Sequence, residues 1–305
     1  MSKHVHKSAL FIGLTFLVNW SLAQLFFTLG GRWHTPAGMA MGALYMLVPM
    51  AVTILVQKGI YSEPICEPLG VSFRPNRWFL IAWMLPPVVA FATFGVSLLL
   101  PGVEYSPQMQ GIVERFESML PPDQVQQLKE QMDRTPVAFL GAVLLGGLSA
   151  GVTVNAAAGF GEELGWRGLL QRELAFLGFW RSSVFIGFIW GLWHAPLILQ
   201  GHNYPQHRVA GVLMMTVWCM LLAPIFSYIR VKAQSVIAAA IIHGTLNATY
   251  GLAIVFVRGG SDLTTGVTGL PGFIVLAVVI LILWLHDRDL LGHDRMEQTN
   301  PVRAS

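Results

Sequence analysis

The sequence is poor in charge. Asp, Glu, Lys and Arg together make up 11% of its 305 residues, against roughly 25% in an average soluble domain. So few charges cannot cover the surface of a soluble protein, and 54% of the residues are hydrophobic. Lipid solvates an apolar surface, provided that every backbone amide is satisfied within a helix or a closed barrel. The composition therefore predicts an integral membrane protein, and its long apolar runs favour helices.

Cysteine is also scarce. The two cysteines, Cys66 and Cys219, are expected to lie too far apart to pair, which excludes a disulfide framework and a cysteine metal site. The net charge of +3 is spread along the chain rather than gathered in one basic patch, which excludes nucleic-acid binding.

Long apolar stretches predict about eight transmembrane helices, each near the roughly twenty residues that cross a hydrocarbon core. They cover about residues 9–29, 39–56, 78–100, 137–158, 183–199, 209–229, 236–257 and 271–285. We therefore expect an all-α, polytopic bundle of membrane helices that forms a single membrane domain over residues 1–305. Most of the Lys and Arg residues fall on one face of this alternation, which puts both termini in the cytoplasm. We expect the bilayer to be the cytoplasmic membrane of a bacterium or archaeon.

A polar interval over residues 101–135 interrupts the apolar pattern. Val125, Leu128 and Met132 recur there at helical spacing among acidic residues. This pattern predicts an external amphipathic connector at the membrane interface. A cap that binds a substrate is the alternative, and nothing in the interval indicates catalysis.

Ionisable residues inside apolar segments are costly, so each of them indicates a functional site. Glu162, Glu163 and Arg167 lie on an otherwise apolar helix. Glu163 and Arg167 are four residues apart with the acid first, which favours an ion pair. Glu162 points about 100° away and is left free to act as a general base. The alternative is an ion-paired helix without chemistry.

Two histidines and an amide follow in later spans. His194 ends an aromatic stretch, and His243 and Asn247 lie four residues apart on one helical face. Each has a plain alternative, because a lone histidine is often a core residue and a His/Asn pair often joins two helices. Together with Glu162 they supply a carboxylate that activates water, a histidine that shares its proton, and donors to an oxyanion.

These three ordered motifs resemble the CPBP family of intramembrane proteases, which includes the CAAX prenyl proteases. The motifs run from Glu162 to Asn247, within a catalytic-motif core over residues 159–250. One departure is visible, since the family usually has Phe where this chain has Trp190, and we interpret that change as one between packing residues.

The resemblance implies an eight-helix bundle with a cavity and an active site that face the cytoplasm. By position, Glu162 and His194 would activate water, while His243 and Asn247 would stabilise the oxyanion. Glu163 and Arg167 would support the first motif helix. The implied activity is an intramembrane endopeptidase that hydrolyses a membrane-associated protein or peptide, including C-terminal CAAX-type segments.

Zinc is a second possibility for the mechanism, because the family is often described as metalloproteases. Glu162, His194 and His243 would then be the ligands, with a fourth position open. The sequence lacks the His-Glu-x-x-His zinc signature. We therefore expect no obligatory cofactor.

Two other functions remain open. The same polar cluster suits a proton-coupled transporter, although no internal repeat stands out. It also suits a non-catalytic membrane scaffold or immunity protein that binds a peptide without cutting it.

Overall fold

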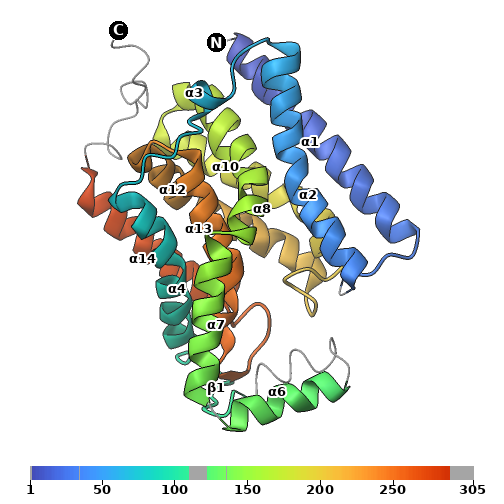
Figure 1. The fold of residues 1–305 in the computed structure, drawn as a ribbon, viewed down its shortest axis with the longest axis vertical. Helices are drawn as coiled ribbons and strands as arrows, with labels where there is room; N and C mark the ends of the chain where they lie inside the picture. The colour runs from blue at the N-terminus through green and yellow to red at the C-terminus, as the bar shows by residue number, and fades with distance from the viewer. Residues whose placement is uncertain (1, 34, 110–121, 135, 289–305) are drawn as a thin grey trace.

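Helices dominate the computed structural model, which describes residues 2–33, 35–109, 122–134 and 136–288 (Figure 1). The helices and helical turns are α1 (Ser2–Thr28), α2 (Pro36–Ile54), η1 (Leu55–Ile60), α3 (Cys66–Leu69), α4 (Arg77–Ser97), α6 (Pro122–Arg134), α7 (Pro136–Gly151), α8 (Val154–Glu163), η2 (Leu164–Leu170), α9 (Gln171–Glu173), η3 (Ala175–Leu177), α10 (Phe179–Trp193), α11 (Ala195–Ile198), α12 (Arg208–Ala233), α13 (Val236–Thr249), η4 (Tyr250–Ile254) and α14 (Leu270–His286). The short strands β1 (Val103–Tyr105) and β2 (Val257–Gly259) pair antiparallel. The predicted all-α class is confirmed.

Five helical segments of the described chain are long and apolar enough to cross a membrane. They are Ser2–Thr28, Pro36–Ile60, Arg77–Ser97, Arg208–Ala233 and Val236–Ile254. The other predicted spans at 183–199 and 271–285 correspond to α10 and α14, whose 15 and 17 residues are fewer than the roughly twenty of a usual span. The prediction of a helical polytopic membrane protein is confirmed, and the number eight stays a prediction.

The predicted span over 137–158 is broken rather than continuous. Ala138–Gly151 and Val154–Glu173 meet at 45°, and they make a sixth candidate span if they are counted together. At the break, a Cβ on Gly151 would lie 2.6 Å from the hydroxyl oxygen of Thr245 on α13. The bend thus falls where the chain passes close to α13.

Helices α8 and α13 cross at close range because glycines face the contact. A Cβ on Gly244 would lie 2.4 Å from the backbone nitrogen of Ala156, and one on Gly159 would lie 3.1 Å from the carbonyl oxygen of Ala240. Small residues of this kind allow the backbones of membrane helices to approach. The crossing places the helix that carries Glu162 beside the helix that carries His243.

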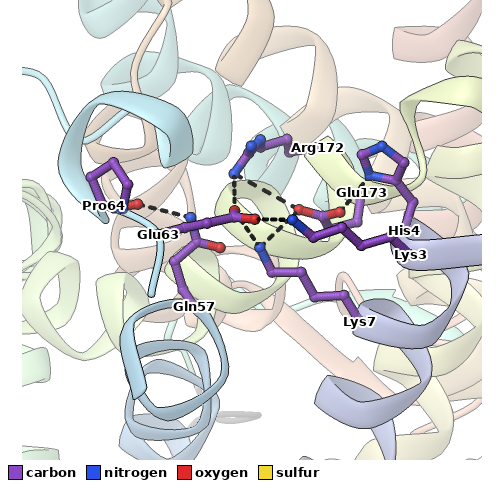
Figure 2. A network of polar contacts seen from close by, with 8 residues as sticks. All are labelled: Lys3, His4, Lys7, Gln57, Glu63, Pro64, Arg172 and Glu173. Atoms are coloured by element: carbon purple, nitrogen blue, oxygen red, sulfur yellow. Dashed lines mark hydrogen bonds and ion pairs between the residues drawn. The ribbon is translucent and has the colours of Figure 1, made fainter. Parts of the chain in front are cut away.

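A group of charged side chains joins the beginning of α1 to the segment after η2 (Figure 2). We call it the N-terminal charge cluster; its members are Lys3, His4, Lys7, Glu63, Arg172 and Glu173. The Lys7 ammonium is fully buried and lies 2.7 Å from Glu63 and 3.2 Å from Glu173. A buried ammonium needs such partners, because an unpaired charge away from water is costly. The cluster therefore fastens α1 to the chain that follows the Glu162 segment.

The start of α1 and the end of α14 lie on the same face of the bundle. Glu63 of the N-terminal charge cluster leads into α3, and the backbone N–H of Val236 donates to the carbonyl of Gly70 just after α3. At the end of α12, Lys232 pairs with Asp287, which follows α14. This arrangement suits an even number of spans, and the side of the membrane on which the face lies stays a prediction.

Helix α6 falls within the predicted connector over 101–135, of which residues 110–121 lie outside the described part of the chain. It lies at the end of the bundle opposite the start of α1 (Figure 1). Val125 is buried, whereas Asp123 and Gln126 are exposed. This one-sided burial is typical of an amphipathic helix, and the location outside the membrane stays a prediction.

Candidate active site

The first predicted motif lies on α8 and the π-helical turn η2. Glu162 and Glu163 are the last residues of α8, and Arg167 lies within η2. All three side chains are buried. Single π turns inside helices are often found at functional sites, and this one carries the guanidinium and directly follows the two carboxylates.

Glu163 is the centre of an ion-paired group. Nη1 of Arg167 donates to both carboxylate oxygens of Glu163 at 3.0 Å, so the ion pair that the sequence predicted is confirmed. Nδ1 of His243 lies 2.7 Å from Oε1 of Glu163. The guanidinium also packs between the rings of Trp190 and Phe226, at 4.6 and 4.9 Å. Glu163 therefore joins the first motif to α13.

Glu162 makes different contacts from its neighbour. Its Oε2 accepts hydrogen bonds from the indole N–H groups of Trp190 at 2.7 Å and Trp166 at 3.3 Å. Its Oε1 lies 3.9 Å from Nε2 of His243, which is too long for a hydrogen bond. No Lys or Arg of the described residues pairs with this carboxylate. Glu162 is thus held through Oε2, while Oε1 faces Nε2 of His243 without a hydrogen bond to it.

His194 reaches the same group through Trp190. It caps the C-terminal end of α10, and the next helix begins with Ala195 and Pro196. Its Nδ1 donates to the carbonyl oxygen of Trp190 at 2.8 Å, which leaves Nε2 as the ring nitrogen available for chemistry. The imidazole packs edge-on against Trp193, with ring centroids 4.7 Å apart.

Asn247 is placed differently from the other predicted site residues. It lies on α13 one turn after His243, but its side chain is exposed, whereas those of Glu162, His194 and His243 are buried. The structure therefore brings Glu162 and His243 together directly, attaches His194 through Trp190, and leaves Asn247 at the surface of the bundle. The role of Asn247 stays a prediction.

The predicted zinc ligands do not form a ligand set. Among the residues that the structure describes, no three His, Cys, Asp or Glu side chains come close enough together to hold a metal ion. Nδ1 of His243 and of His194 is already occupied by Glu163 and by the backbone of Trp190. We derive no chemical step through a metal from this arrangement.

The sequence analysis missed two contacts of the candidate site. Trp190 was interpreted as a packing residue, and Trp166 was not assigned a contact, yet both indoles donate to Glu162. The signal for Trp166 was its i+4 spacing from Glu162, the same spacing that predicted the Glu163 and Arg167 pair. No local signal pointed to Trp190, which is 28 residues away.

Part of the chain is similar to a known protein family. Residues 135–249, from the start of α7 to the end of α13, match the family described as "Type II CAAX prenyl endopeptidase Rce1-like". This region is thus similar to that family. It contains every predicted site residue, and it confirms the resemblance that the three motifs indicated.

One curated relative matches the chain. It is "CAAX prenyl protease 2" of Methanococcus maripaludis, 29% identical over 130 residues, which is 39% of this chain and 45% of the relative. The alignment thus spans less than half the length of the curated protein. The match therefore covers only a part of each protein.

Proposed function

We propose that this protein is an intramembrane endopeptidase in which Glu162 activates water. One observation carries the proposal: a buried carboxylate, without a Lys or Arg partner in the described chain, lies between two indole N–H groups and a histidine inside a membrane bundle. A carboxylate held in this way is suited to general-base catalysis. The Rce1-like match supports peptide hydrolysis as the reaction class.

The space between Glu162 and His243 suits the nucleophile. A water molecule placed between Oε1 and Nε2, which are 3.9 Å apart, can hydrogen-bond to both atoms. Glu162 would take a proton from this water while the water oxygen attacks the scissile carbonyl carbon. The tetrahedral oxyanion then collapses, the C–N bond breaks, and the proton passes to the leaving amine. The products are a new carboxylic acid and a new amine.

Charge balance favours a proton bound near Glu162 and His243. The buried site holds two carboxylates, Glu162 and Glu163, but one guanidinium, that of Arg167, and a net charge in a membrane interior is costly. One further proton, shared by Glu162 and His243, makes the group neutral. A proton held on His243 gives Nε2 a donor for the oxyanion, as the sequence motif implied.

His194 and Asn247 complete the proposed machinery. The free Nε2 of His194 would share the proton that moves during attack, and the exposed carboxamide of Asn247 would meet the substrate where it enters from the surface of the bundle. A membrane-associated polypeptide is the substrate class that fits a site at this depth. The name of the curated relative supports a CAAX-type C-terminal segment.

Glu162→Gln tests this function. Purified protein in liposomes is incubated with a lipidated peptide that ends in a CAAX-type sequence, and the released C-terminal fragment is measured by mass spectrometry. We expect release by the natural protein and by Glu67→Gln, a change on the exposed surface, but none by a folded Glu162→Gln variant. Equal release by Glu162→Gln would overturn the proposal. A sealed-vesicle proton flux that requires Glu162 would favour a transporter instead.

A further inference from the structure

Trp190 contacts four ionisable residues of the buried site, namely Glu162, Arg167, His194 and His243. Its indole N–H donates to Glu162 at 2.7 Å, and its carbonyl oxygen accepts from His194 at 2.8 Å. Its ring lies 5.5 Å from the ring of His243 and 4.6 Å from the guanidinium carbon of Arg167. The side chain is 2% exposed, and its ring also packs against Phe226, with ring centroids 5.8 Å apart.

The hydrogen bond to Glu162 is not a routine consequence of burying an indole. Trp193 and Trp218 are equally buried, and neither indole N–H has a hydrogen-bond partner among the described residues. The pairing of Trp190 with Glu162 is therefore a specific feature of the site, which a phenylalanine of similar shape cannot provide.

The bond also determines how the Glu162 carboxylate is turned. Both indoles bind Oε2, and the bond from Trp190 is the shorter, so Oε1 is the oxygen left toward His243. A free carboxylate rotates about its last side-chain bond, and a general base must meet its water in one orientation.

We infer that Trp190 is a positioning residue that holds Oε1 of Glu162 toward the attacking water. This inference rests on the proposed function of Glu162 as the base. It assigns Trp190 a role in the rate of the chemical step and none in substrate affinity.

Trp190→Phe tests the role in turnover. It removes the donor and keeps an aromatic ring, and we expect kcat for the lipidated peptide to fall about tenfold or more while KM changes less than about twofold. Trp218→Phe is the matched control, because it makes the same change at a buried indole without a partner, and it should leave kcat unaltered. If Trp190→Phe folds poorly, 3-benzothienylalanine at position 190 removes the N–H with almost no change in shape.

A spectroscopic measurement tests the hydrogen bond without any substrate. In protein labelled with 15N-tryptophan, the indole resonance that Trp190→Phe removes belongs to Trp190. We expect that resonance to move upfield in Glu162→Gln, because an amide oxygen is a weaker acceptor than a carboxylate. The resonance of Trp218 should stay in place.

The possible outcomes distinguish the positioning role of Trp190 from the proposed function of Glu162. A Trp190 resonance that ignores Glu162→Gln overturns the inference, whatever the proteolytic activity. A resonance that responds, together with an unchanged kcat in Trp190→Phe, overturns the positioning role and leaves the proposed function intact. Failure of the natural protein to cleave any lipidated peptide overturns the proposed function, and the positioning role with it.

Discussion

Nδ1 of His243 lies 2.7 Å from Oε1 of Glu163, although 80 residues separate them in the sequence. The contact depends on Gly159 and Gly244, which allow α8 and α13 to approach. The same imidazole presents Nε2 to Glu162 at 3.9 Å. One histidine thus joins the carboxylate that supports the site to the carboxylate that we propose as its base.

The two adjacent glutamates should differ when each is replaced by glutamine. Glu163→Gln removes the counter-charge of the buried Arg167, at a cost of about 3 to 5 kcal/mol in the free energy of unfolding. Glu162→Gln keeps an oxygen acceptor for both indoles and should cost about 1 kcal/mol or less. Denaturant unfolding in detergent micelles measures both values. Equal losses in the two variants would contradict the division of roles.

The N-terminal charge cluster should make the free energy of unfolding depend on pH in the acid range. Partial burial acts to raise the pKa of Glu63, but hydrogen bonds from Lys7 and Lys3 and the charge of Arg172 outweigh it and lower the pKa from 4.5 to about 2. A carboxyl with a lowered pKa stabilises the folded state above its unfolded pKa, and the contribution is lost as pH falls through the folded pKa. We expect the loss between about pH 4.5 and pH 2.

Glu63→Gln measures that contribution. At neutral pH the variant should melt below the natural protein, and the two melting temperatures should converge as pH falls toward about 2. Lys3 is exposed, and solvent screens its ion pair with Glu63. The difference in the free energy of unfolding between the variant and the natural protein should therefore stay near or below about 1 kcal/mol. Glu67→Gln, on the exposed surface, is the control. A difference that persists at low pH would show that packing rather than charge is involved.

The close crossing of α8 and α13 predicts a steric effect at Gly244. In Gly244→Ala the new Cβ would lie 2.4 Å from the backbone nitrogen of Ala156, so the helices must separate. We expect a loss of about 1 to 3 kcal/mol and reduced proteolysis, because His243 moves away from Glu162. Gly146→Ala on α7 is the control, since nothing lies within 4 Å of its added Cβ. A stable and active Gly244→Ala variant would contradict the close approach of α8 and α13 at this position.

Metal removal is expected to leave proteolysis intact. Among the described residues, Glu162, His194 and His243 do not gather as a three-ligand set. Purified protein should therefore keep its activity in excess chelator, and elemental analysis should find no stoichiometric zinc. Zinc at one equivalent, with activity lost on chelation and regained on its return, would overturn this prediction.

Much of the site could be predicted locally. The Glu163 and Arg167 ion pair followed from an i, i+4 spacing, and the same periodicity placed His243 and Asn247 on one helix. Neighbours on one helix are determined by backbone geometry, which the sequence specifies directly. Contacts between helices were not predictable in this way, so the roles of Trp190 and the burial of Lys7 were missed.

By itself the sequence determined that this is a helical membrane protein with an Rce1-like set of polar residues, because the length of the apolar runs and the spacing of charges are local properties. Only the tertiary structure decided which of those residues meet. Glycines at the crossing of α8 and α13 put His243 against both glutamates, the end of α10 attached His194 through Trp190, and Asn247 stayed exposed. The physical reason is that these contacts depend on how helices far apart in the chain pack, and packing is a property of the whole bundle.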